Sequence, residues 1–413
     1  MLAVSATATC LAVAPATVTI PAGTDIQIRL TSKVASDASK PKDVINAVVI
    51  APVMVNGLLA VPAGTRIRGR IDQAKRAVSA DERALLQFDF NEIVASNGKP
   101  AKLKTRILDV DNARESVDDK GKIIGILAKE TLSARVNQGI AKVAQRNPAL
   151  ADILDAAKGS VLGDTNPEID YEPGTELTIR LLDPVKWDQA GPPPAMPPVR
   201  DENALYKLVN SFPYRAYSEN PRKPSDITNL MFVGTQAQIE DAFKEAGWST
   251  AHALSNQSVM ETIRAIAELR GYKEAPVSVL TLEGRAPDMV FQKQNNTFAQ
   301  RHHVRIWQMS GRYEGQPIWV ASSTHDIGID FSEENHTFIH KIDPQVDRER
   351  AKIVSDLLFT KRVQSLALVE RPRVPTNTLN ATGDQIITDA KMAVVILSPA
   401  AAEPQRATTS IFQ

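Results

Sequence analysis

The chain has 413 residues and a mass of 45.0 kDa, more than the roughly 100–200 residues of one typical domain, so we expect two folded units. Its 48 basic residues balance 48 acidic residues, and this zero formal charge argues against nucleic acid or an anionic membrane surface as a partner. Cys10 is the only cysteine, which excludes an intramolecular disulfide and a thiolate metal site. No stretch reaches the roughly 18–20 apolar residues of a transmembrane helix.

Residues 1–16 are small and apolar, and Arg29 is the first basic residue. The segment Ala12-Val13-Ala14 has the small-x-small form of a signal cleavage site, but the charged region that should precede it is missing. We expect a truncated signal sequence, with a disordered tail as the alternative. A signal sequence predicts a periplasmic, secreted or otherwise envelope-associated protein.

An internal repeat marks the first half of the chain: TIPAGTDIQIRL (19–30), AVPAGTRIRGRI (60–71) and YEPGTELTIRL (171–181). In each copy proline and glycine predict a tight turn, and the alternating apolar residues that follow predict a strand with one buried face. Further strands are expected at Val44–Val55, Leu85–Phe90 and Lys102–Leu108. The apolar period becomes helical within residues 123–159. Residues 17–187 are therefore predicted to form a mainly β, barrel-like domain with a helical hairpin insertion at 123–159.

The P-x-G-T turns, the segment at Ser36-Asp37 and the helical excursion resemble the β-barrel domain of TrbI-like conjugation and type IV secretion channel proteins. In that family the excursion takes part in envelope assembly. The resemblance implies envelope or secretion-system proteins as partners. A generic β-domain with a surface hairpin is the alternative.

A proline-rich segment, DQAGPPPAMPPV, follows at 188–199, and its composition predicts an extended linker over residues 188–200. Residues 201–400 are then a second domain, and the polar residues 401–413 are expected to be a disordered tail.

The second domain reads as α+β, a mostly antiparallel sheet with helices against one face. Thr235 and Gln238 form a capping-box pattern at the start of one helix, and Ser258 and Glu261 repeat it for another. A last helix is expected at Pro344–Phe359. The expected strands are Leu230–Val233, Val277–Leu282, Met289–Lys293, His302–Met309, Ile318–Ser323, Val363–Val369 and Met392–Leu397.

Five ordered blocks in this domain resemble the LssY C-terminal domain family over about residues 226–397: DAFKEAGW (241–248), APDMVFQK (286–293), RHHVRIW (301–307), WVASSTHDIGI (319–329) and HKIDPQVDRER (340–350). In that family the domain often follows a membrane-embedded phosphatase-like domain and is associated with secretion loci. This sequence contains none of the phosphatase motifs. The resemblance therefore implies a fold and a secretion context, not phosphatase activity.

Five of the six histidines lie between residues 300 and 350, and strand parity suggests how they are arranged. His303 and Arg305 share one strand face, and His325 and His340 lie on neighbouring predicted strands. We predict that these residues, with Asp326 and Asp343, form a candidate catalytic face.

Three neutral imidazoles, those of His303, His325 and His340, suit Zn²⁺ or a similar divalent metal. Asp326 or Asp343 would then orient a ligand or act as general base. One alternative is phosphate or carboxylate binding by Arg305, His303 and His340. The other is a purely structural, hydrogen-bonded set of histidines.

From the sequence we expect a cell-envelope accessory or binding protein associated with secretion or envelope assembly. The alternative is a metal- or histidine-dependent hydrolase acting on a phosphorylated or lipid-derived envelope substrate. The oligomeric state is not predicted.

Overall fold

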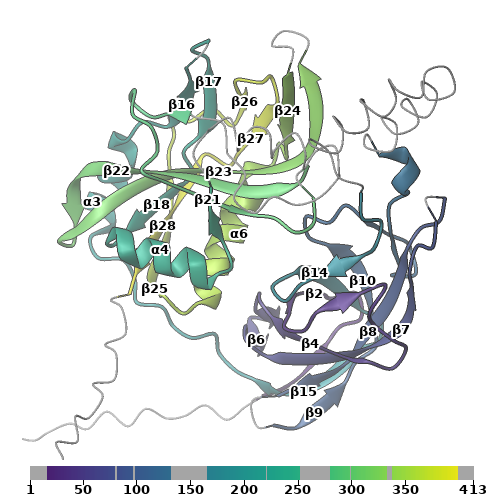
Figure 1. The fold of residues 1–413 in the computed structure, drawn as a ribbon. Helices are drawn as coiled ribbons and strands as arrows, with labels where there is room; N and C mark the ends of the chain where they lie inside the picture. The colour runs from purple at the N-terminus through teal and green to yellow at the C-terminus, as the bar shows by residue number, and fades with distance from the viewer. Residues whose placement is uncertain are drawn as a thin grey trace, which may run out of the picture.

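The computed structural model describes residues 16–79, 81–95, 98–131, 165–219, 221–251, 280–297, 299–332 and 337–398, except for the side chains of 130, 329–332 and 337–340. Figure 1 shows two bodies, an N-terminal domain built of strands and a C-terminal domain in which a sheet is covered by helices. The predicted fold class is confirmed. None of the helices in the described ranges has the length and apolar character needed to cross a bilayer.

The N-terminal domain consists of short strands and one 3-10 turn. In chain order these are β1 (Ala16–Ile20), β2 (Asp25–Leu30), β3 (Val34–Ala35), β4 (Val44–Val49), β5 (Val53–Val55), β6 (Leu58–Val61), β7 (Arg66–Lys75), β8 (Leu85–Val94), β9 (Pro100–Lys102), β10 (Thr105–Val110), β11 (Ser116–Val117), β12 (Ile123–Ile124), η1 (Ala128–Glu130), β13 (Asp170–Tyr171), β14 (Glu176–Leu181) and β15 (Val185–Ala190).

The main sheet of this domain has the order β10-β14-β2-β4-β7-β8-β12-β11 and is nearly closed. At the closure, the Thr105 hydroxyl of β10 donates to the Phe90 carbonyl of β8 at 2.8 Å and accepts from the Phe90 N–H at 3.0 Å. Alternate strand residues point inward and form one apolar core that includes Phe88, Phe90 and Trp187. The alternating apolar residues from which a barrel-like domain was predicted are the ones that fill this core.

The three repeated turns have the same construction. The hydroxyls of Thr24, Thr65 and Thr175 donate to the carbonyl three residues earlier at 2.6–2.8 Å, and the glycine before each threonine has a positive φ. The expected helical segment begins differently, because Ile123–Ile124 pairs as β12 with β8. Residues 132–159 of that segment lie outside the described residues.

The expected linker begins later than predicted. Residues 188–190 belong to β15, which pairs antiparallel with β1. The Gly191 and Leu59 backbones then form an isolated bridge, so the N-terminal domain extends past the predicted boundary at residue 187.

The C-terminal domain contains three described helices and the strands β16 to β28. Its elements are α3 (Glu202–Ser211), β16 (Arg215–Ser218), β17 (Pro224–Ile227), β18 (Leu230–Val233), α4 (Gln236–Glu245), β19 (Ser249–Thr250), β20 (Leu280–Thr281), β21 (Met289–Lys293), β22 (Arg301–Tyr313), β23 (Gln316–Ser332), β24 (Thr337–Ile342), α6 (Val346–Phe359), β25 (Val363–Glu370), β26 (Asn377–Leu379), β27 (Gln385–Ile387) and β28 (Lys391–Leu397). The helix expected from Ser258 lies outside the described residues.

The sheet of this domain has the order β19-β21-β22-β23-β18-β28-β25, with β24 added to β23, and only the β18–β28 pair is parallel among these described strands. Helices α4 and α6 bury Phe243 and Ile353 against one sheet face. Helix α3 buries Leu205 and Val209 against the other face. The prediction that the helices cover one face was therefore wrong for α3, a helix that was not predicted from the sequence.

Candidate metal site between the two domains

The register of β22 and β23 determines which histidines meet. His302 lies directly opposite His325, and His303 lies opposite Thr324. Directly paired residues of antiparallel strands project to the same sheet face. His302 and His325 therefore share the face that α4 and α6 cover, whereas His303 is on the other face. The predicted grouping of His303 with His325 was wrong, because strand parity fixes faces within a strand but not the register between strands.

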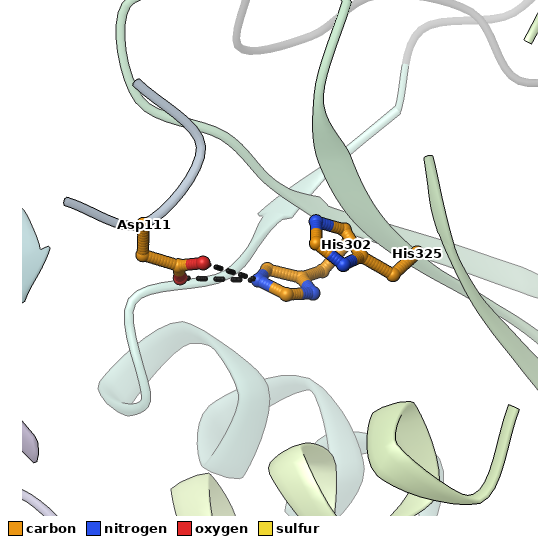
Figure 2. A group of neighbouring side chains, drawn as sticks. All are labelled: Asp111, His302 and His325. Atoms are coloured by element: carbon orange, nitrogen blue, oxygen red, sulfur yellow. Dashed lines mark hydrogen bonds and ion pairs between the residues drawn. The ribbon is translucent and has the colours of Figure 1, made fainter. Parts of the chain in front are cut away.

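The N-terminal domain adds a carboxylate to this histidine pair. Asp111 follows the last residue of β10, and its N–H donates to the Glu176 carbonyl of β14 at 2.9 Å. Asn112 comes next with a left-handed φ of 52°. This short turn directs Asp111 toward His302, whose Nε2 lies 3.1 Å from Asp111 Oδ2 (Figure 2).

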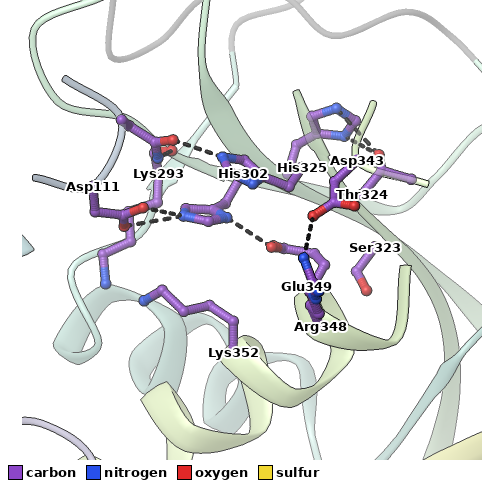
Figure 3. Close-up of polar contacts among 12 residues, drawn as sticks. Asp111, Lys293, His302, Ser323, Thr324, His325, Asp343, Arg348, Glu349 and Lys352 are labelled. Atoms are coloured by element: carbon purple, nitrogen blue, oxygen red, sulfur yellow. Dashed lines mark hydrogen bonds and ion pairs between the residues drawn. The ribbon is translucent and has the colours of Figure 1, made fainter. Parts of the chain in front are cut away.

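His302 is held between two carboxylates from different domains. Its Nδ1 is 2.7 Å from Glu349 Oε2 in the first turn of α6, and its Nε2 faces Asp111 (Figure 3). Burial alone would lower the pKa of His302, but the negative charges of Glu349 and Asp111 outweigh it and raise the pKa to about 10. In the metal-free protein His302 is therefore a cation, and a metal ion at Nε2 would displace the proton from that nitrogen.

His325 is oriented by Asn112. Its Nε2 is 2.8 Å from Asn112 Oδ1, and because an amide oxygen can only accept, Nε2 carries the proton and Nδ1 keeps a lone pair. The imidazole stacks on His302 with ring centroids 4.2 Å apart. Burial and the neighbouring His302 charge both lower the pKa of His325, which favours the neutral form that a metal requires.

Asp111, His302 and His325 each offer one ligand atom, and these atoms all lie within 4.8 Å of one another. Ligands in a tetrahedral site with bonds of about 2.1 Å are about 3.4 Å apart, so small side-chain movements would close this set around an ion. Glu349 Oε1 is buried and has no hydrogen-bond partner among the described residues. An unsatisfied buried carboxylate oxygen beside the histidines suits a cation.

A pocket of about 230 Å³ opens beside these groups, and both domains line it. We call it the acidic pocket, because five carboxylates outnumber its two non-histidine cations: Asp109, Asp111, Glu176, Asp343 and Glu349 against Arg348 and Lys352. Burial and the charge of Asp111 raise the pKa of Asp109. The excess of negative charge favours a bound cation over a bare anion.

The remaining predicted site residues are divided between the two faces. On the far face, Asp326 accepts from Arg301 at 2.9 Å and lies 2.7 Å from His303 Nε2, and Arg305 donates to Asp226 at 3.0 Å. This set is buried and does not line the acidic pocket. It matches the alternative in which the residues form a purely structural, hydrogen-bonded set.

Asp343 does line the acidic pocket, and its N–H donates to the His325 carbonyl at 2.8 Å. Helix α6 begins two residues later than the predicted Pro344. The backbone of His340 pairs with Ile329 on β23, and its side chain lies outside the described part of the chain.

The sequence prediction missed His302, Asp111, Asn112 and Glu349. Glu349 stood inside a quoted block but was not assigned to the site. Asp111 and His302 are 191 residues apart. The only local signal was the acidic segment Asp109-Val110-Asp111-Asn112 at a strand end, which alone indicates no particular partner.

This domain also matches a known family. Residues 210–392 match the family described as LssY C-terminus. The prediction of an LssY-like C-terminal domain is thereby confirmed.

The match does not reach residues 17–187, for which the TrbI-like resemblance stays a prediction. The curated proteins give no match to this chain. Asp111 and Asn112 thus come from outside the matched region, whereas His302, His325 and Glu349 lie within it.

Proposed function

We propose that the acidic pocket binds one divalent transition-metal ion through Asp111, His302 and His325, and that the protein is a metal-dependent hydrolase. The observation that supports this most is that one ring nitrogen of each imidazole is hydrogen-bonded to an orienting residue. Glu349 and Asn112 each hold one ring nitrogen of a histidine, and hydrogen-bonded partners of this kind orient ligand histidines in metalloproteins.

Two histidines and one carboxylate leave room for water or substrate at a four- or five-coordinate ion. A bound ion of this type lowers the pKa of water to about 7 and polarises a phosphoryl or carbonyl oxygen. Asp343 lies in the same pocket with its side chain 22% exposed, and we assign it the role of general base. The water oxygen bonds to phosphorus or carbon, the bond to the leaving group breaks, and the water proton passes through Asp343 to the leaving oxygen.

The substrate should be anionic. Arg348 projects at the pocket with its side chain 77% exposed, and its closest acidic atom, Asp343 Oδ2, is 3.7 Å away. Lys352 is already held by Glu176 at 2.6 Å. Arg348 therefore keeps a guanidinium for a phosphate or carboxylate, whose geometry it fits in a bidentate manner. This agrees with a phosphorylated or lipid-derived envelope substrate.

Metal content and hydrolysis of 4-nitrophenyl phosphate by the purified chain test the proposal. We expect one Zn²⁺ or Mn²⁺ per chain, and His325→Ala or Asp111→Asn should weaken metal affinity at least about 100-fold and abolish turnover, because each removes a ligand. Asp183→Asn, at an exposed carboxylate away from the pocket, is the matched control and should change neither. Metal binding that survives His325→Ala would overturn the proposed site.

A binding role in the cell envelope is the second candidate. The observation in its favour is that both ring nitrogens of His302 have carboxylate partners from the chain itself, so the pocket is complete as a polar cleft between domains. In that case the partner would be an envelope or secretion-system protein, in the periplasm or outside the cell. Metal-free protein that captures such a partner and hydrolyses no ester would favour this candidate.

A further inference from the structure

A second and larger pocket lies on the other side of Asp111 and Glu176, which line both pockets. Its volume is about 460 Å³. The N-terminal domain contributes the turn before β14, and the C-terminal domain contributes residues 294–296 after β21. We call it the amide pocket, because asparagine and glutamine side chains are prominent in its wall. The two pockets therefore adjoin at the shared residues Asp111 and Glu176.

The residues that line the amide pocket are mostly of polar type. Ligand pockets are mostly lined by hydrophobic and aromatic side chains. Among the described residues that line this pocket, Pro173 is the only one with an apolar side chain, and the others are polar, charged or glycine. An acyl chain would leave these polar groups desolvated without partners, which is unfavourable. A ligand rich in hydroxyl groups would satisfy them, since amides and carboxylates donate to and accept from hydroxyls.

Two groups in the wall have unused hydrogen-bonding capacity. Asp170 Oδ1 is buried and has no partner among the described residues. Among the described residues Asn295 makes only long contacts of 3.4 Å: its Oδ1 lies that far from the Thr175 hydroxyl oxygen, and its Nδ2 donates to the Asp111 carbonyl. Contacts at this length are weak. Asn295 can therefore turn to a ligand at little cost.

The neighbouring Asn296, unlike Asn295, is held by short hydrogen bonds. Its amide donates to both Glu115 oxygens at 2.8 and 3.0 Å, and its oxygen accepts from the Arg114 N–H at 3.1 Å. Asn296 is thus part of the scaffold that joins the domains. Asn295, one residue earlier, faces the same pocket without being fixed.

The charge of the pocket excludes a second anionic group. Five carboxylates line it, with only Arg114 and Lys293 as cations, and Lys293 is engaged by Asp356 at 3.1 Å. A neutral, hydroxyl-rich group fits this lining best.

We infer that the amide pocket binds a sugar, so that the substrate is a glycosyl phosphate or a similar phosphorylated polyol whose anionic group lies at the acidic pocket. This inference rests on the proposed function for the position of the phosphate. The sugar subsite itself rests on the walls of the amide pocket.

Two substrates separate the inference from the proposed function: glucose 1-phosphate, which carries a sugar, and 4-nitrophenyl phosphate, which does not. With Zn²⁺-loaded full-length protein, Asn295→Ala should raise KM for glucose 1-phosphate about tenfold, the effect of one lost hydrogen bond. The same variant should leave kcat/KM for 4-nitrophenyl phosphate within about twofold. Asn46→Ala, at an exposed asparagine of β4 that lines neither pocket, is the control.

Saturation-transfer NMR on the sugar protons of glucose 1-phosphate gives a readout that needs no turnover. Signal transfer in the wild type that is lost in Asn295→Ala supports the sugar subsite even if neither ester is hydrolysed, in which case the proposed hydrolase fails alone. Turnover of 4-nitrophenyl phosphate without any sugar transfer signal overturns the subsite and leaves the hydrolase standing. Equal effects of Asn295→Ala on both substrates would also overturn it.

Discussion

Asn112 is the single residue on which the geometry of the candidate site depends most. Its backbone takes a left-handed conformation, its Oδ1 accepts from His325, and its Nδ2 donates to the Lys293 carbonyl at 3.3 Å. It thus fixes the tautomer of a ligand histidine and ties the two domains together. Asparagine suits this position because it tolerates positive φ better than other non-glycine residues.

Replacing Asn112 by glycine or alanine separates these two roles. Both variants lose the amide that orients His325, and we expect Zn²⁺ affinity to fall about 10- to 100-fold in each. Alanine must also adopt the left-handed conformation, which costs about 1–2 kcal/mol, whereas glycine adopts it freely. Calorimetric titration with Zn²⁺ and urea unfolding measure the two effects. Wild-type Zn²⁺ affinity in Asn112→Gly would contradict the orienting role.

Residues with local signals were predictable, and residues that depend on distant partners were not. The alternation along β22 correctly placed His303 with Arg305 on one face, where the two side chains are in contact. Which of those faces meets His325 depends on the register with β23, which no local pattern specifies. The carboxylate that completes the set belongs to another domain.

At the scale of elements, capping and turn chemistry predicted helix α4 and the three repeated turns. The Thr235–Gln238 capping box is present in both directions, and α4 begins directly after it. The bounds of β18 and β21 match their predictions. Helix α3 was missed although Asp201 caps it by accepting from the Ala204 N–H at 2.9 Å.

Gly69 determines how closely β7 and β8 approach. The register shifts between Arg68 and Gly69, and a Cβ at Gly69 would lie 2.0 Å from the Asp89 carbonyl oxygen. Because that atom belongs to the neighbouring backbone, relief requires moving a strand of the barrel. We expect Gly69→Ala to lower the free energy of unfolding by about 3 kcal/mol, the upper end for overpacking.

The control for Gly69→Ala is Gly191→Ala, where a Cβ would meet nothing within 4 Å. This variant should stay within about 0.5 kcal/mol of the wild type. Urea unfolding followed by circular dichroism measures both variants. Equal stabilities of the two would show that β7 can move away from β8 without loss.

At the scale of the whole molecule, the two domains meet through buried charges. Glu176 of β14 accepts from Arg29 at 2.7 Å and from Lys352 at 2.6 Å, and it also pairs with Lys293. Lys293 and Lys352 further contact Asp356 of α6. This cluster lies beside both pockets, so the same contacts that dock the domains also shape the candidate site. The length of the chain predicted two domains but not a shared site. Charged residues are mostly exposed to solvent, so nothing in the sequence marks these particular residues as buried partners.

The charge of Glu176 should make domain docking sensitive to acid. Burial alone would raise the pKa of Glu176, but Lys293, Lys352 and Arg29 outweigh it and hold the pKa well below its usual value. A carboxyl whose pKa is depressed in the folded state contributes stability above its unfolded pKa of about 4.3 and loses that contribution as pH falls through the folded value. The wild type should therefore lose interdomain stability only below about pH 4.

Glu176→Gln removes this titrating group and leaves the two buried lysines with less opposing charge. Breaking a buried ion pair from one side costs about 3–5 kcal/mol, so we expect a loss of that size at pH 7 and a flatter dependence of stability on pH between 5 and 3. Glu172→Gln is the matched control, because Glu172 also pairs with a lysine, Lys33, but its side chain is 58% exposed, and exposed pairs contribute about 0–1 kcal/mol. Urea unfolding across this pH range distinguishes the outcomes. If Glu176→Gln keeps the wild-type pH dependence, the acid sensitivity belongs to other carboxylates and the domains are docked by contacts that do not need this charge.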